Sequence, residues 1–163
     1  MNILITFDYE LFFGTNTGTI DNCIIKPVNR LLEIGDKYGI PFSFFIDAGY
    51  IRKLEQLKNK YPELKSDYSK AIENIKLLHS KGHEVQLHIH PHWEKAIYEN
   101  GKWQFNSKYY RLDSFNENEV IEIFKKYQAL LTQITNEQPS AFRAGGWCIQ
   151  PFTPKIKKGF KET

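Results

Sequence analysis

The sequence predicts an α/β protein built on a parallel sheet, and two observations support this fold class. First, four short runs of β-prone apolar residues are spread over the 163 residues, and turn or polar residues end each run. Second, the segment after each run carries apolar residues at helical spacing. Strands that alternate with helices form parallel sheets with right-handed crossovers, so we expect all strand carboxyl ends at one edge of the sheet.

The four predicted strands are residues 2–7, 41–46, 85–90 and 141–144. The third shows the clearest pattern, because Val85, Leu87 and Ile89 alternate with polar residues, as expected for a strand. His88 and His90 then share one face of this strand. Pro91 ends the strand, since proline has no N–H to donate to a neighbouring strand.

Helix boundaries are marked by prolines, glycines and one capping pair. The first predicted helix has Pro27 near its start and ends at Gly39. Pro62 divides the next helical segment into two, and Gly82 closes the second part. Further helices are predicted after Asn116, which forms a capping box with Glu119, and after Thr153-Pro154.

Residues 94–115 are polar and aromatic and contain a turn at Asn100-Gly101. A loop of this length in a compact domain is usually functional or mobile. We therefore predict a long functional or mobile loop between the third strand and the next helix.

Composition excludes several classes of function. The net charge of +3, without a block of Lys and Arg, argues against a nucleic-acid-binding protein. No apolar run approaches the length of a membrane span. The 2 cysteines, Cys23 and Cys148, form neither a disulfide framework nor a CxxC metal site. The first residues lack the features of a signal peptide, so we expect a cytoplasmic protein.

Histidines are concentrated at the end of the third strand. Three of the chain's 5 histidines, His88, His90 and His92, fall within a stretch of five residues. Clustered imidazoles are good ligands for a divalent metal such as zinc. The alternative is an exposed polar strand end with no ligand, which is the better interpretation of a single histidine than of three.

The other strand ends carry chemistry that complements these histidines. Asp8 and Glu10 follow the first strand, Asp47 the second and Arg143 the fourth. Two histidines and one carboxylate form a hydrolytic metal arrangement, and a second carboxylate next to an arginine can act as general base. Structural roles remain open as well: a loop cap for Asp8, a turn residue for Asp47 and a surface ion pair for Arg143.

Three motifs carry a family resemblance. They are Thr6-Phe7-Asp8-Tyr9-Glu10, His88-Ile89-His90-Pro91-His92 and Phe142-Arg143-Ala144-Gly145-Gly146-Trp147. Together they resemble the first three motifs of the polysaccharide deacetylases, the NodB-homology or carbohydrate esterase family 4 group. The resemblance implies the N-terminal part of a distorted (β/α) barrel that binds a divalent metal, most often zinc (Zn²⁺). It further implies hydrolysis of the acetamide of an N-acetylated sugar or polysaccharide substrate.

The resemblance also assigns roles to individual residues. Asp8 corresponds to the general base, Arg143 to its partner, and His88 and His92 to metal ligands. The usual metal-binding Asp is replaced by Tyr9, so Glu10, which lies on the same side of the chain as Asp8, becomes the expected third ligand.

Further residues are expected to contact the substrate. His90 has at most a supporting or substrate-binding role, and aromatic rings beside the site are candidates for stacking on sugars. These aromatic candidates are Trp93, Tyr110 and Trp147, with Trp103 and Tyr109 as further possibilities.

Two alternative functions and one structural expectation complete the sequence analysis. One alternative is hydrolysis of a cyclic amide, which needs a closed pocket where a glycan needs an open groove. The other is a non-catalytic carbohydrate-binding relative, because no histidine follows Arg143 to act as the family's general acid. For the same reason we expect residues 1–163 to form a single but C-terminally incomplete catalytic domain. The oligomeric state is left open.

Overall fold

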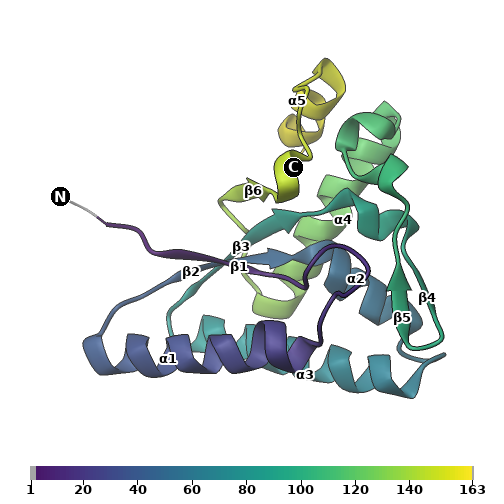
Figure 1. Cartoon of the computed structure of the whole chain (residues 1–163). Coiled ribbons are helices and arrows are strands. Elements are labelled where there is room, and N and C mark those ends of the chain that lie inside the picture. Colours follow the sequence, from purple (N-terminus) through teal and green to yellow (C-terminus); the bar gives the residue numbers. More distant parts are fainter. Residues whose placement is uncertain (1–2, 163) are drawn as a thin grey trace.

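The computed structural model describes residues 3–162, and its centre is a curled parallel sheet with helices packed around it (Figure 1). The four strands have the order β1-β2-β3-β6, and every neighbouring pair is parallel. Their bounds are Thr6–Tyr9 (β1), Ser43–Asp47 (β2), Glu84–Ile89 (β3) and Phe142–Ala144 (β6). The predicted α/β class is thus confirmed, and the curled sheet is consistent with part of an α/β barrel.

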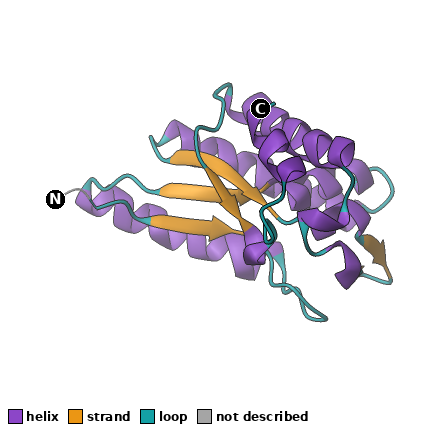
Figure 2. Cartoon of the chain, turned by 90° about the horizontal axis from the view of Figure 1, so that it is seen from above, coloured by secondary structure: helices purple, strands orange, loops and turns teal. Residues whose placement is uncertain are grey.

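The strands point in the same direction (Figure 2), so their carboxyl ends share one edge of the sheet. Asp47 of β2 is in register with His88 of β3, which in turn is in register with Arg143 of β6. Three polar residues from three strands therefore form one row across the sheet. This row is the base on which the candidate site is built.

The first strand is shorter than the sequence predicted. Pairing with β2 begins at Thr6, opposite Ser43, and residues 3–5 lie outside the strand. Ile3 and Leu4 are 73% and 71% exposed. Their apolar character predicted a buried strand, but β2 has no residues opposite them to complete the ladder.

The helices agree with the predicted pattern. They are α1 (Lys26–Tyr38), α2 (Ala48–Leu57), α3 (Pro62–Ser80), α4 (Glu117–Thr135) and α5 (Pro154–Lys161), and a π-helical turn, Asp21–Ile25, precedes α1. Gly39 ends α1 in the left-handed conformation, and Asn116 and Glu119 form the expected capping box of α4. Helices α1 and α3 lie on the same side of the sheet (Figure 1).

Residues 94–115 differ from the predicted loop, because they contain a two-stranded antiparallel hairpin. Its strands are β4 (Ile97–Glu99) and β5 (Lys102–Gln104). Asn100 and Gly101 form the turn with positive φ angles of 52° and 73°. Tyr98 and Trp103 are opposite each other, both 8% exposed, and their ring centroids are 4.8 Å apart. This buried aromatic pair stabilises the hairpin, and period-two alternation over only three residues was too short to predict it.

No helix among the described residues is long and apolar enough to cross a membrane.

Candidate metal centre

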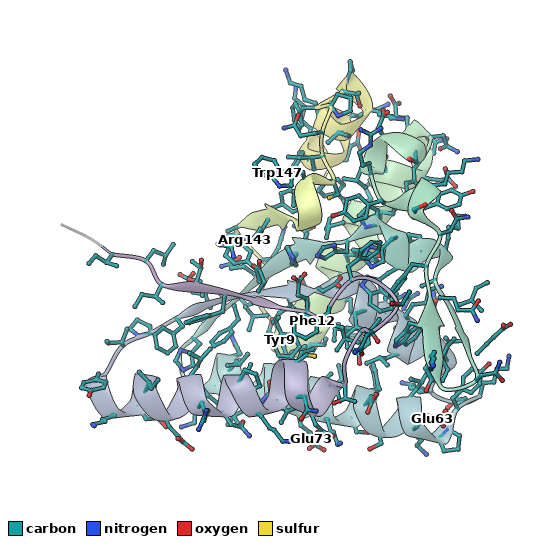
Figure 3. The ribbon with its side chains drawn as sticks, in the orientation of Figure 1. Tyr9, Phe12, Glu63, Glu73, Arg143 and Trp147 are labelled. Carbon is teal, nitrogen blue, oxygen red and sulfur yellow. The ribbon has the colours of Figure 1, made fainter. Side chains whose placement is uncertain are left out.

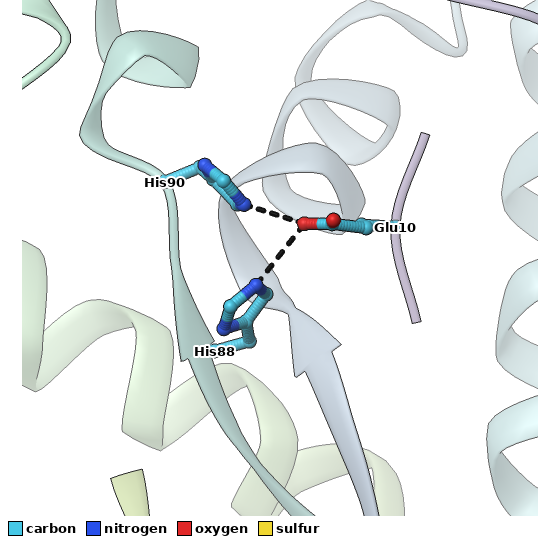
Figure 4. A group of neighbouring side chains, drawn as sticks. All are labelled: Glu10, His88 and His90. Atoms are coloured by element: carbon cyan, nitrogen blue, oxygen red, sulfur yellow. Dashed lines mark hydrogen bonds and ion pairs between the residues drawn. The ribbon is translucent and has the colours of Figure 1, made fainter. Parts of the chain in front are cut away.

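Three potential metal ligands meet at the carboxyl edge of the sheet: Glu10, His88 and His90 (Figure 4). Glu10 directly follows β1, His88 lies in β3, and His90 directly follows β3. The Oε2 atom of Glu10 is 3.0 Å from Nε2 of His88 and 2.5 Å from Nε2 of His90. Since β2 lies between β1 and β3, the Glu10 side chain reaches across the carboxyl end of β2.

The hydrogen bonding of His88 suits a metal ligand. Its Nδ1 lies 3.0 Å from the carbonyl oxygen of Arg143, which can only accept, so Nδ1 carries the proton. In a neutral ring, Nε2 then presents a lone pair toward the carboxylate oxygen of Glu10, and two acceptors face each other. A cation between them would remove this conflict, and a metal-bound histidine commonly donates its other N–H to a carbonyl.

Burial and the contacts within the cluster shift the pKa values of Glu10 and His90 in opposite directions. Burial raises the pKa of Glu10, but the interactions with the His88 and His90 rings outweigh it and lower this pKa from 4.5 to about 2. Burial lowers the pKa of His90, and the hydrogen bond to Glu10 reverses this, so that the pKa of His90 is raised. The carboxylate is therefore ionised, as a metal ligand must be.

Gly145 leaves the space that the His90 ring occupies. A Cβ atom at this position would lie 2.3 Å from Nε2 of His90. Gly146 has a φ of +52°, and a Cβ there would lie 1.8 Å from the hydroxyl of Tyr110. A pair of adjacent glycines by itself indicates only a turn with positive φ, and this applies to Gly146. The role of Gly145 depends on a contact between β6 and β3 that no local pattern predicts.

An ion pair between Arg143 and Asp8 lies beside the three potential ligands. Arg143 forms an ion pair with Asp8, donates a hydrogen bond to Thr6 Oγ1 at 2.7 Å, and stacks on Phe45 with 4.0 Å between the guanidinium carbon and the ring centroid. Arg143 is thus held at three points and orients the Asp8 carboxylate. Asp8 is not part of the cluster of potential ligands, and its side chain is 38% exposed. Figure 3 shows Arg143 on the side of the sheet that faces away from α1 and α3.

His92, an expected metal ligand, lies outside the group that the structure brings together. It is 3% exposed, and its ring centroid is 4.8 Å from that of Phe13 and 4.7 Å from that of Phe105. Burial lowers the pKa of His92 from 6.5 to about 3. His90 takes the expected place beside Glu10, because the extended chain through Ile89 points His88 and His90 to the same side. Pro91 then begins a 3₁₀ turn that directs His92 into the aromatic cluster.

The predicted substrate-binding residues are found in different environments. Trp93 is 2% exposed, and its indole N–H donates to Asp47 at 2.5 Å, so its ring belongs to the core and offers no face to a sugar. Tyr110 is half-buried beside Phe13 and His92. Trp147 is 81% exposed and lies directly after the glycine pair (Figure 3).

Asp47 has a larger structural role than the turn residue that the sequence favoured. Asp47 is 1% exposed, and its carboxylate accepts from the Trp93 indole and caps α2 by accepting from the backbone N–H of Tyr50 at 3.4 Å. Burial raises the pKa of Asp47. Through Trp93, this residue ties the end of β2 to the turn that follows His90.

Comparisons of the chain with protein-family models, with curated proteins and with solved structures find no match. The resemblance to the polysaccharide deacetylases therefore rests on the three sequence motifs alone.

Proposed function

We propose that this chain is a metal-dependent hydrolase that removes an N-acetyl group from a sugar or polysaccharide. The observation that carries the proposal is the position of the Glu10, His88 and His90 cluster beside the ion pair of Asp8 and Arg143. A hydrolytic metal centre needs both parts: ligands for the ion, and a carboxylate that is free to take a proton from water.

Glu10, His88 and His90 fit a divalent ion such as Zn²⁺, because two imidazole nitrogens and one carboxylate oxygen converge within 4.8 Å of one another. Such an ion, when bound, supplies Lewis-acid polarisation of the acetyl carbonyl and a lowered pKa for water. His88 is fixed for this role by its hydrogen bond to the Arg143 carbonyl. Gly145 leaves the room that the His90 ring needs beside Glu10.

Asp8 accepts the proton from the attacking water on its carboxylate. The guanidinium of Arg143 stabilises the ionised form of this carboxylate and orients it. The backbone carbonyl of Arg143 also accepts a hydrogen bond from Nδ1 of His88. One residue of β6 therefore connects the proposed base to the proposed metal centre.

Acetate release from N-acetylated oligosaccharides and metal content, both measured on the full-length protein, test this proposal. We expect Asp8→Asn to retain the metal and to lower the rate of hydrolysis by about 10²–10⁴-fold, the usual contribution of a general base. Asp36→Asn is the matched control, because Asp36 forms a surface ion pair with Lys81 away from this site. The control should keep both the metal and the rate.

Acetate release and metal content together distinguish the proposed hydrolase from its alternatives. Stoichiometric metal with no acetate release from any N-acetylated glycan would favour the non-catalytic carbohydrate-binding relative. Loss of metal in Asp8→Asn, with metal retained in Glu10→Gln, would show that these two carboxylates have exchanged roles.

A further inference from the structure

Helix α1 carries an exposed apolar stripe beside the face that it buries against the rest of the fold. The stripe consists of Leu31, Ile34 and Tyr38, whose spacings of three and four residues place them on one flank of the helix. Ile34 is 46% and Tyr38 62% exposed, and Leu31 is half-buried. The positions that α1 buries are Val28, Leu32 and Gly35. The exposure of Ile34 and Tyr38 shows that no described element covers the stripe.

The apolar stripe faces away from α3, the helix on the same side of the sheet. Asp36 forms an ion pair with Lys81 at the end of α3, so the flank of α1 that carries Asp36 is turned toward α3. Ile34 and Tyr38 are each two residues from Asp36, which corresponds to about 160° around an α-helix. The stripe is therefore accessible to another molecule.

A row of basic side chains runs along α1 next to the apolar stripe. Lys26, Arg30 and Lys37 are exposed and lie within about 40° of one another around the helix. Within residues 3–162, none of the three forms an ion pair, and Lys26 donates instead to the side-chain oxygen of Asn22 at 2.8 Å. Glu33 borders the basic row on the side away from the stripe. The charges of the basic row thus remain available to an acidic partner.

The surface of α1 is hollowed where the stripe and the basic row begin. A groove of about 740 Å³ is lined by Asn22, Lys26, Pro27, Asn29, Arg30 and Leu31. Apolar and basic side chains therefore meet in one groove. Near the end of α1 they meet again, because Nζ of Lys37 is 5.0 Å from the ring centroid of Tyr38. A groove along a helix accepts the side-chain ridge of a second helix better than it fits a flat bilayer.

We propose that α1 is a docking surface for an amphipathic helix with an acidic flank, supplied by a partner protein. The apolar residues of this helix would pack on Ile34 and Tyr38, and its carboxylates would lie against Arg30 and Lys37. Two α1 helices packed through the stripe would bring their basic rows side by side, which argues against a second copy of the chain. The inference is independent of the proposed function, because no residue of the candidate metal centre lies on α1.

Binding of two designed peptides to the full-length protein tests the docking surface. Both peptides form about four helical turns with leucines at the spacing of a helix seam, and the flanking positions hold Glu in one peptide and Lys in the other. Backbone amide shifts locate the peptide, and their titration gives its affinity. We expect the Glu peptide to shift the amides of residues 26–38 and the Lys peptide to bind at least about 10-fold more weakly. The affinity of the Glu peptide should fall between about 0.05 M and about 0.5 M salt.

Exposed residues of α3 provide matched controls for variants of α1. Ile34→Ala should weaken binding of the Glu peptide by about 5- to 30-fold, as expected for an apolar anchor of an interface. Leu77→Ala should leave this binding unchanged, because Leu77 is similarly exposed, at 40%, but lies on α3. Arg30→Glu should weaken binding of the Glu peptide and strengthen that of the Lys peptide. Lys76→Glu, which changes the net charge equally on the exposed surface of α3, should do neither.

Equal affinities of the two peptides, or equal losses in Ile34→Ala and Leu77→Ala, would overturn the docking surface. Absence of binding, or shifts confined to amides outside residues 26–38, would overturn it as well. Vesicles of phosphatidylglycerol and phosphatidylcholine distinguish a membrane from a protein partner. Vesicle binding that is lost in Ile34→Ala and Arg30→Glu, without binding of the Glu peptide, would assign the surface to an anionic membrane and contradict the proposal.

Discussion

The two ends of β3 each carry a buried histidine, and the comparison shows what distinguishes a structural histidine from a candidate ligand. His83, just before the strand, is 5% exposed, and His90, just after it, is 7% exposed. Burial is therefore nearly the same at both ends. What differs is the group that each ring faces.

At the amino end of β3, His83 and Gln86 form hydrogen bonds that join neighbouring strands, while Nε2 of His83 has no hydrogen-bond partner among the described residues. His83 Nδ1 accepts the backbone N–H of Phe42 at 3.1 Å, and its ring stacks on Phe42 with centroids 5.5 Å apart. The side-chain oxygen of Gln86 accepts from the backbone N–H groups of Ser140 and Ala141 at 2.9 Å and 2.8 Å. These contacts fix β3 against β2 and the start of β6, and they gather no set of potential ligands among the described residues.

At the carboxyl end of β3, the rings of His88 and His90 face a carboxylate. Both Nε2 atoms approach the same oxygen of Glu10, which is an arrangement that needs a shared cation or additional protons. The comparison teaches that a buried histidine bonded to backbone holds the fold, whereas buried histidines that converge on one acidic oxygen form a candidate site.

The largest expected effect is on zinc affinity, and it distinguishes the histidines at the two ends of β3. We expect His88→Ala or His90→Ala to weaken zinc binding by more than about 100-fold, because loss of a ligand costs more than loss of its supporting hydrogen bond. His83→Asn should leave zinc affinity unchanged, since the Asn side-chain oxygen can still accept the Phe42 N–H. It should lower the free energy of unfolding by about 0.5–3 kcal/mol through loss of the buried ring.

Zinc titration of the three variants measures their zinc affinity, and chemical denaturation measures their free energy of unfolding. An unchanged zinc affinity in His90→Ala together with a large loss in His92→Ala would restore the ligand set that the family resemblance implies.

The sequence predicted the sheet more completely than the site. Period-two alternation in β3, the Pro62 break and the Asn116–Glu119 capping box are local signals, and the corresponding elements formed where expected. The choice between His90 and His92 was not local. The same alternation placed His88 and His90 on one face, but the motif spacing of the family favoured His92, and only the turn at Pro91 shows where His92 points.

Contacts between distant segments account for the features that the sequence did not reveal. The fit of Gly145 against His90 joins β6 to β3, and the buried pair of Asp47 and Trp93 joins β2 to the turn after β3. The β4–β5 hairpin depends on the pairing of Tyr98 with Trp103 within a segment that was predicted as a loop. None of these contacts leaves a periodic signal in a single sequence.

A smaller effect is expected from a methyl group added beside each histidine. Gly145→Ala places a Cβ against the His90 ring, so we expect zinc affinity to fall by about 10- to 100-fold, as when a supporting contact of a ligand is disturbed. Gly35→Ala is the matched variant at the other end, where a Cβ would lie 3.1 Å from Cε1 of His83. It should keep the zinc affinity and change the free energy of unfolding by about 1 kcal/mol or less, because helix propensity offsets the tight contact. Equal zinc affinities in the two variants would show that Gly145 does not position His90.

The smallest effect concerns pH, and it belongs to the structural end of β3. Burial lowers the pKa of His83, with the charges of Asp36 and Lys81 as weaker and opposing influences. The folded protein therefore holds His83 neutral at pH values where the unfolded chain, with a pKa of about 6.5, binds a proton. The stability contributed by the neutral ring is fully present above that value and is lost as the pH falls toward the lower folded pKa, with a slope of at most about 1.4 kcal/mol per pH unit. Asn does not titrate, so the difference in unfolding free energy between wild type and His83→Asn should narrow from about pH 8 to about pH 5. Denaturant titrations of both proteins without added metal measure this difference, and a difference that stays constant or widens would mean that His83 is not held neutral by the fold.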